Sequence, residues 1–261
     1  MIDLPRSDLI DAHAHVWDRS CDFVPGARYR PDYEATIDTY LRVLDAHGIA
    51  RAVLVQPSFL GTDNRYLLDC LRTHPDRLRG IVVVDPRITD QALADMAGMG
   101  VIGHRYNMVG RDPGVLRTGA YRDLTARATA FGWWTEVQAK GEDWPDIADL
   151  LRSDGARVMV DHFGLPSALT CRGIAALEDW DADRLCVKLS APYRQSCADY
   201  VHAARRLTDS APEPALAWGS DWPWTQHEGR HVYADCLAWL ESWTDDRARA
   251  TISAALGPLG F

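Results

Sequence analysis

The stretch Leu78-Arg79-Gly80-Ile81-Val82-Val83-Val84 ends in four consecutive apolar residues. A short, continuous apolar run of this kind is typical of a strand in a parallel sheet, which helices bury on both faces. We therefore predict a strand over residues 78–84 inside a domain of the α/β class.

The same alternation of strand and helix extends in both directions from this strand. A first strand, Leu9-Ile10-Asp11-Ala12, leads into His13 and His15, and further strands are predicted over residues 52–56, 101–106, 134–138, 157–161, 185–189 and 216–219. Apolar residues at helical spacing predict helices over residues 36–47, 64–73, 90–99, 122–131, 144–151, 170–177, 198–209, 233–243 and 246–256.

Eight strand–helix units in 261 residues favour closure of the sheet into a barrel, since (β/α)8 barrels have about 250 residues. No Gly-x-Gly-x-x-Gly follows a predicted strand, which disfavours the open, dinucleotide-binding alternative. We predict a single (β/α)8 TIM-barrel domain over residues 1–261.

Composition limits the partners of the protein. With 28 basic and 37 acidic residues the formal charge is −9, so binding to nucleic acid or an anionic membrane is not expected. The six cysteines are scattered without a Cys-x-x-Cys pair, and the N-terminus has no signal-peptide pattern. We expect a cytoplasmic protein with reduced thiols and a small-molecule partner, and the oligomeric state stays open.

The carboxyl ends of barrel strands converge on one face, where the active sites of TIM barrels lie. His13 and His15 are two residues apart on the first strand, so both imidazoles are expected on one face. The side chains near the other predicted strand ends are Gln56, Ser58, Arg105, Asn107, Arg111, Gln138, Lys140, Asp161, His162, Lys188, Ser190, Arg194, Ser220 and Asp221.

Each of these residues has a chemical interpretation and also a purely structural one. The imidazoles can hold a divalent ion or polarise a carbonyl, or simply bind backbone at strand ends. Asp221 can take a proton from water, or Ser220-Asp221-Trp222-Pro223 can be a capping turn. Three arginines on one rim suggest a pocket for carboxylates, although arginines are usually solvated surface charges. The three are Arg105, Arg111 and Arg194.

Several of these segments together resemble the amidohydrolase-related proteins, and among them the lactonases that act on 2-pyrone-4,6-dicarboxylate. The matching segments are Ile10-Asp11-Ala12-His13-Ala14-His15-Val16-Trp17, Gln56-Pro57-Ser58, Gly61-Thr62-Asp63-Asn64, residues 80–86, Val160-Asp161-His162, Val187-Lys188-Leu189-Ser190-Ala191-Pro192-Tyr193-Arg194 and Gly219-Ser220-Asp221-Trp222-Pro223. The combination is specific, although no single segment is.

The resemblance implies a (β/α)8 barrel that hydrolyses a carboxylated lactone without a required metal. It assigns Asp221 as the base that activates water. It further implies that His13, His15 and His162 polarise the lactone carbonyl, and that the substrate contacts are Arg105, Arg111, Arg194, Tyr29 and Ser58.

Three departures from these lactonases line the predicted substrate side: His104, Gly110 and Gln138. They leave the identity of the lactone open. One alternative is a hydrolase or decarboxylase in which one zinc or manganese ion is held by His13, His15, His162 and Asp221. Another is a non-catalytic barrel that binds an organic acid.

Overall fold

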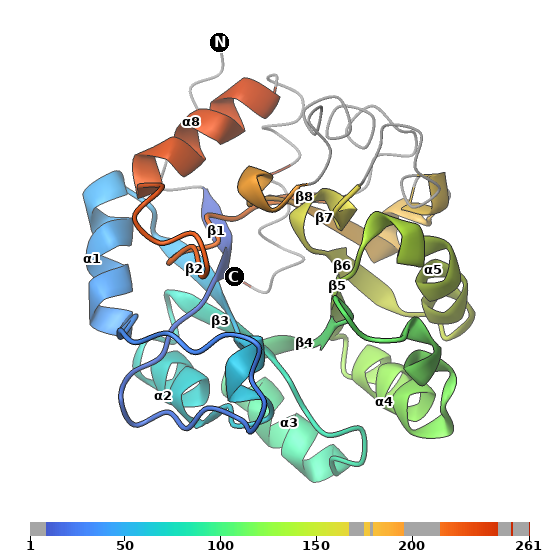
Figure 1. Cartoon of the computed structure of the whole chain (residues 1–261). Coiled ribbons are helices and arrows are strands. Elements are labelled where there is room, and N and C mark those ends of the chain that lie inside the picture. Colours follow the sequence, from blue (N-terminus) through green and yellow to red (C-terminus); the bar gives the residue numbers. More distant parts are fainter. Residues whose placement is uncertain (1–8, 167–174, 178–179, 196–214, 245–251, 253–260) are drawn as a thin grey trace.

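The computed structural model describes residues 9–166, 175–177, 180–195, 215–244, 252 and 261. Eight parallel strands follow one another around a barrel in chain order, which confirms the predicted fold (Figure 1). The strands are β1 (Ile10–Ala14), β2 (Arg51–Val55), β3 (Leu78–Val82), β4 (Val101–Asn107), β5 (Trp134–Gln138), β6 (Arg157–Val160), β7 (Leu185–Leu189) and β8 (Ala215–Trp218).

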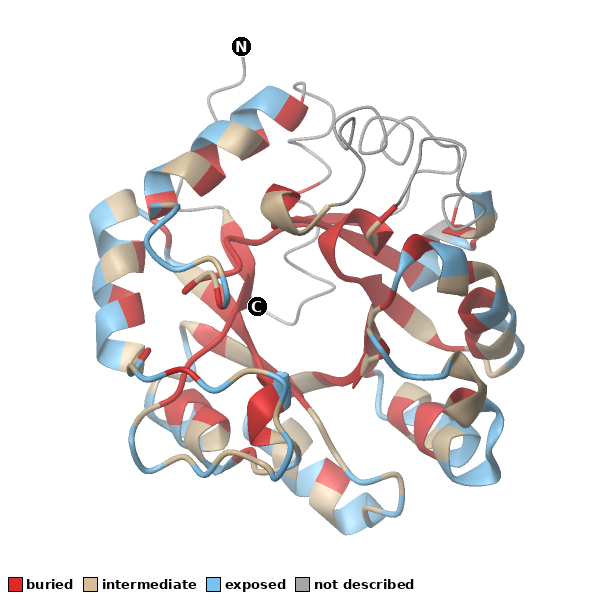
Figure 2. Cartoon of the chain, viewed as in Figure 1, coloured by how far each residue is buried: buried red, intermediate tan, exposed pale blue. Residues whose placement is uncertain are grey.

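Helices pack around the outside of this barrel, each with an exposed face toward solvent and buried residues on the side that faces the strands (Figure 2). They are α1 (Ile37–His47), α2 (Arg65–Thr73), α3 (Asp90–Gly98), α4 (Gly119–Ala130), α5 (Trp144–Ser153) and α8 (Tyr233–Trp243). Local capping sets their ends. Thr36 caps α1 by accepting from the backbone of Thr39, and Gly48 ends it in a left-handed conformation. The helices predicted over 170–177, 198–209 and 246–256 lie wholly or largely outside the described residues.

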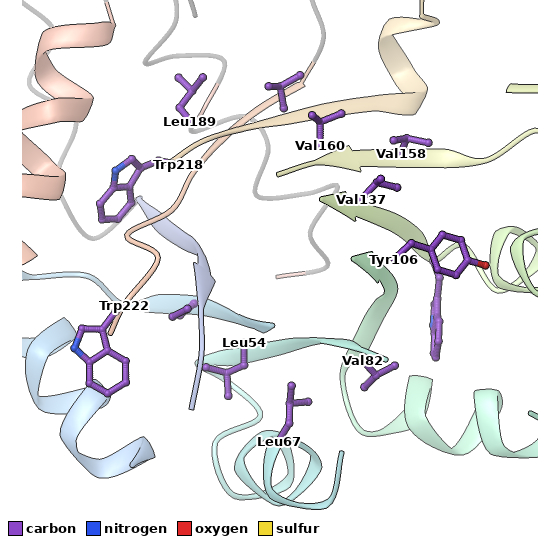
Figure 3. Close-up of a cluster of buried hydrophobic side chains, with 14 of the residues drawn as sticks. Leu54, Leu67, Val82, Tyr106, Val137, Val158, Val160, Leu189, Trp218 and Trp222 are labelled. Atoms are coloured by element: carbon purple, nitrogen blue, oxygen red, sulfur yellow. The ribbon is translucent and has the colours of Figure 1, made fainter. Parts of the chain in front are cut away.

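Side-chain alternation along the strands separates two apolar layers. Val53 and Val55 belong to the barrel interior, whereas Leu54 between them belongs to the layer under the helices. Figure 3 shows Leu54 facing Leu67 of α2 in this outer layer. The phase of each strand therefore fixes which of its side chains reach the mouth of the barrel.

The segment after β8 closes the barrel onto β1. Ala14 forms a parallel bridge with Trp222, and the backbone N–H of His15 donates to the Trp222 carbonyl at 2.8 Å. The N–H of Asp221 donates to the carbonyl of His13, also at 2.8 Å. The contacts that close the barrel thus bring the predicted histidines beside the predicted carboxylate.

Among the described residues, none of the helices is both long and apolar enough for a membrane span. Four cysteines in this part of the chain, Cys21, Cys70, Cys186 and Cys236, are free thiols.

Candidate active site

A layer of buried charges lies directly above the apolar interior of the barrel. Trp134 belongs to that interior, and Glu136, two residues further along β5, points the same way. The same spacing along neighbouring strands brings in the other charged members of the layer, Arg105, Asp161 and Lys188.

The four ionisable groups of this layer contact one another in pairs. Lys188 pairs with Glu136 and lies 3.5 Å from Asp161, while Arg105 Nη2 donates to Asp161 Oδ2 at 2.8 Å. Burial and the neighbouring Asp161 carboxylate raise the pKa of Glu136 to about 8, against the opposing effect of Lys188 and Arg105. Burial would also raise the pKa of Asp161, but the surrounding cations hold it well below its usual range.

Lys188 determines which nitrogen of His13 carries the proton. The ammonium nitrogen lies 3.1 Å from His13 Nδ1, and an ammonium can only donate hydrogen bonds. Asp161 Oδ1 is 3.2 Å from the same Nδ1 and would accept from it in the other tautomer, whereas the ammonium of Lys188 favours the tautomer in which Nδ1 accepts. Burial lowers the pKa of His13 well below its ordinary value. The neutral ring therefore carries its proton on Nε2, which faces Asp221.

The other two histidines surround His13. Ring centroids lie 4.9 Å apart for His13 and His15 and 4.8 Å apart for His13 and His162. His15 Nδ1 donates to the carbonyl of Val55 at 2.7 Å, so Nε2 is the ring nitrogen that faces Asp221. His162 Nδ1 is hydrogen-bonded to Ser190 Oγ at 2.8 Å, and burial lowers the His162 pKa to about 4.

Asp221 presents one restrained and one unpaired oxygen. Arg194 Nε and the Tyr193 hydroxyl donate to Oδ2 at 2.6 and 2.7 Å. Oδ1 has no hydrogen-bond partner and lies 3.6 Å from Nε2 of both His13 and His15. Burial alone would raise the Asp221 pKa, but Arg194 and the histidines outweigh it and hold this pKa well below its usual range. The side chain is therefore a carboxylate with one oxygen available for chemistry.

Close backbone contacts place Asp221 at this point. A Cβ on Gly219 would lie 2.6 Å from the Cβ of His13, so only glycine lets the end of β8 approach β1 so closely. The buried Asp11 carboxylate accepts from both the backbone N–H and the hydroxyl of Ser220. Asp221 itself has a φ of 57°, a left-handed conformation that non-glycine residues adopt mainly where surrounding contacts impose it.

A cavity of about 400 Å³ opens above these groups. It brings together most of the predicted site residues, namely His15, His162, Asp221, Arg105, Arg194, Tyr29 and Ser58, with His13 beneath them. Arg111 is the exception, because its side chain is exposed and does not line the cavity. The predicted metal ligands His13, His162 and Asp221 each offer one atom within 4.8 Å of the others.

Sequence reasoning missed several residues of this site. Glu136 was detectable as the charged residue two positions after Trp134, and so on the same face of the predicted strand over residues 134–138. Tyr193 precedes Arg194 in a quoted segment but received no role, and its bond to Asp221 depends on tertiary structure. Arg28 lies in the long loop after β1, where no periodicity indicates the direction of a side chain, yet it lines the cavity.

Three buried neutral histidines make the folded state sensitive to acid. Burial lowers the pKa of His104 to about 3, that of His162 to about 4, and that of His13 well below 6.5. Below pH 6.5 these histidines bind protons in the unfolded chain but stay neutral in the folded chain. The free energy of unfolding therefore falls as the pH falls. Glu136 acts oppositely, since its folded pKa of about 8 exceeds its ordinary 4.5 and its contribution is lost as the pH rises toward 8.

Between pH 6 and 5 the effect of the three histidines exceeds that of Glu136, so the unfolded chain binds roughly two more protons than the folded chain. Each such proton changes the free energy of unfolding by about 1.4 kcal/mol per pH unit. We expect the free energy of unfolding in urea to fall steeply over this range. His104 is bonded to Thr135 at 3.0 Å and lies outside the cavity, so His104→Gln tests the assignment without touching the site. The variant is expected to reduce the slope by about one proton, and an unchanged slope would contradict this explanation.

The amidohydrolase family model matches residues 10–253. A 2-pyrone-4,6-dicarboxylate hydrolase of Comamonas testosteroni is 28% identical over 236 residues, which are 82% of this chain and 76% of that protein.

Two solved structures resemble the chain over nearly its whole length. A probable 2-pyrone-4,6-dicarboxylic acid hydrolase from Acinetobacter baumannii, with citric acid bound, gives a TM-score of 0.90 at 29% identity and covers 97% of this chain and 100% of its own. A putative hydrolase of the same name from Pseudomonas putida gives 0.86 at 34% identity, covering 96% and 97%.

Proposed function

Because the chain belongs to the amidohydrolase family, we propose that it hydrolyses a carboxylated lactone of the 2-pyrone-4,6-dicarboxylate type. The observation that carries the proposal is a pair of buried atoms, Asp221 Oδ1 and His13 Nε2. They have no hydrogen-bond partner and are 3.6 Å apart, below a cavity that arginines line. An ionised acceptor beside a neutral donor suits attack of water on a carbonyl.

The attacking water is held by two acceptors. Asp221 Oδ1 lies 3.6 Å from His15 Nε2, the ring nitrogen that the Nδ1 contact to Val55 leaves facing the cavity. A water molecule that donates one hydrogen to each would satisfy both, with an oxygen lone pair free for attack. In this scheme Asp221 removes the proton as the water oxygen bonds to the lactone carbon.

The lactone carbonyl is polarised from the opposite side. His13 Nε2–H donates to the carbonyl oxygen and stabilises the oxyanion of the tetrahedral intermediate, an effect worth about 3 kcal/mol for one well-placed donor. His162 borders the same space. The bond from the carbonyl carbon to the ring oxygen then breaks, and the proton on Asp221 passes to that oxygen, which gives a ring-opened acid.

The arginines bind the carboxylates of the substrate and also tune the base. Arg194 faces the cavity while its Nε bonds Asp221, and Arg105 faces the same cavity from above Asp161. A substrate carboxylate bound to Arg194 adds negative charge beside Asp221 and weakens the electrostatic stabilisation of the Asp221 carboxylate by the guanidinium. The pKa of Asp221 is then expected to rise, which makes it a better base only when substrate is bound.

One divalent ion is the alternative way to polarise the carbonyl. His13, His15, His162 and Asp221 offer a suitable donor set for zinc or manganese, which would act as a Lewis acid when bound. His13 can join that set only without its Nε2 proton, and the donor contact from Lys188 keeps the proton there. The metal-independent route therefore has the more direct support.

A lactone panel tests the function and the metal together. We expect the purified protein to open 2-pyrone-4,6-dicarboxylate, followed by ultraviolet absorbance, and to act at least tenfold less well on the unsubstituted pyrone. Incubation with a chelator is expected to leave the rate unchanged, with metal content measured on the same sample. Loss of activity that zinc or manganese restores would establish the metal alternative, and binding without turnover of any lactone would indicate a non-catalytic barrel.

A further inference from the structure

Arg28, in the loop after β1, lines the cavity and is exposed to solvent. Its Nη1 donates to the backbone carbonyl of Val109, in the loop that follows β4, at 2.6 Å. Both residues line the cavity that contains Asp221 and His162. The contact joins two separate loops, and because Arg28 is exposed, its side chain lies on the solvent side of the cavity.

Arg28 is the arginine of the cavity whose charge is not compensated within the described residues. Arg105 is paired with Asp161 and Glu136, and Arg194 is paired with Asp221. Arg28 makes only a neutral contact to a carbonyl oxygen. A guanidinium has five N–H donors, so four remain for an anion that enters the cavity.

The local sequence around Val109 makes room for this guanidinium. Gly110 has a φ of +75°, and a Cβ added to it would lie 3.0 Å from Arg28 Nη1. A larger residue would therefore be strained and would crowd the contact. Arg111 follows at once, but it is exposed and lies outside the cavity lining. Gly110 thus leaves space for the guanidinium of Arg28, whereas the neighbouring Arg111 does not line the cavity.

We propose that Arg28 binds a second anionic group of the substrate, at the entrance end, and so makes the enzyme selective for lactones with two acidic groups over those with one. This inference rests on the proposed lactonase function and assigns one part of its specificity. Arg194, beside Asp221, holds the group nearer the reacting carbonyl. Arg28, which does not touch Asp221, contributes to binding and leaves the chemical step unaffected.

The test compares Arg28→Gln with the matched control Arg30→Gln on one dicarboxylate and two monocarboxylates. Arg30 is an exposed arginine of the same loop that does not line the cavity. A hydrogen bond to a charged group typically contributes a factor of about 10 to 100. For 2-pyrone-4,6-dicarboxylate we expect Arg28→Gln to lower kcat/KM by that factor, mainly through KM. For the monocarboxylate that lacks the group held by Arg28, the change is expected to stay below about threefold.

A binding experiment keeps this inference separate from the catalytic proposal. Isophthalate and benzoate carry two and one carboxylates on a ring of similar size and cannot be hydrolysed. We expect calorimetric titration to show that wild type and Arg30→Gln bind isophthalate at least tenfold more tightly than benzoate, and that Arg28→Gln loses this preference. Equal preference in Arg28→Gln and wild type, or a loss in Arg111→Gln alone, would overturn the role of Arg28. Absence of turnover by the wild type would instead refute the lactonase proposal.

Discussion

Replacing Asp221 with asparagine is expected to lower kcat for lactone hydrolysis by roughly 10³-fold, since a positioned general base contributes factors of about 10² to 10⁴. Asparagine keeps the shape of the side chain and an oxygen that Arg194 and Tyr193 can still approach. It cannot accept the proton of water through an ionised oxygen. Single-turnover kinetics on 2-pyrone-4,6-dicarboxylate would measure the loss, because they separate the chemical step from product release.

A matched comparison distinguishes loss of the base from general damage. Tyr193→Phe removes one donor from Oδ2 but leaves Arg194 on that oxygen and leaves Oδ1 free. We expect this variant to retain at least a tenth of the wild-type kcat. Asp221→Asn should also still bind isophthalate, because the carboxylate-binding arginines remain. Turnover by Asp221→Asn close to that of the wild type would exclude Asp221 as the base.

Most of the fold could be predicted because local patterns of apolar residues indicate the strands and helices. The run from Ile81 to Val84 indicated a strand buried on both faces, and the structure places residues 78–82 in β3. The prediction extended this strand by two residues, because Val83 and Val84 are also apolar. Val83 leaves the strand as its backbone N–H and carbonyl bond the side chain of Asn64. Such a contact joins residues 19 apart and has no signal in a local pattern.

The site was only partly predictable, because the direction of a side chain on a strand follows from the sequence pattern, whereas the direction of a side chain in a loop does not. Residues at strand ends, such as His15 and Asp221, follow from the topology of a barrel. Loop residues do not, so Arg111 was expected in the cavity and Arg28 was not. The irregular register of β1 between Asp11 and Ala14 also has no clear sequence signal, although it helps to turn His13 toward the buried charges.

Replacing Lys188 with methionine is the second change with a large expected effect, on both stability and rate. The substitution leaves Glu136 and Asp161 with Arg105 as the remaining cation of the layer. Breaking a buried ion pair by removing one partner typically costs 3–5 kcal/mol. We therefore expect urea denaturation to show a loss of about that size in the free energy of unfolding.

The same substitution is expected to lower kcat by roughly 10²-fold, the effect of losing one oxyanion donor. Without the ammonium, Nδ1 of His13 can carry the proton and donate to Asp161, 3.2 Å away, so that Nε2 no longer donates to the carbonyl. The double variant Lys188→Met/Glu136→Gln separates the two effects. It removes the ammonium together with the carboxyl group that it contacts, so much of the stability should return while kcat stays low. Recovery of kcat together with stability would mean that Lys188 acts only as a structural ion-pair partner, whereas recovery of stability alone assigns it to the orientation of the His13 proton.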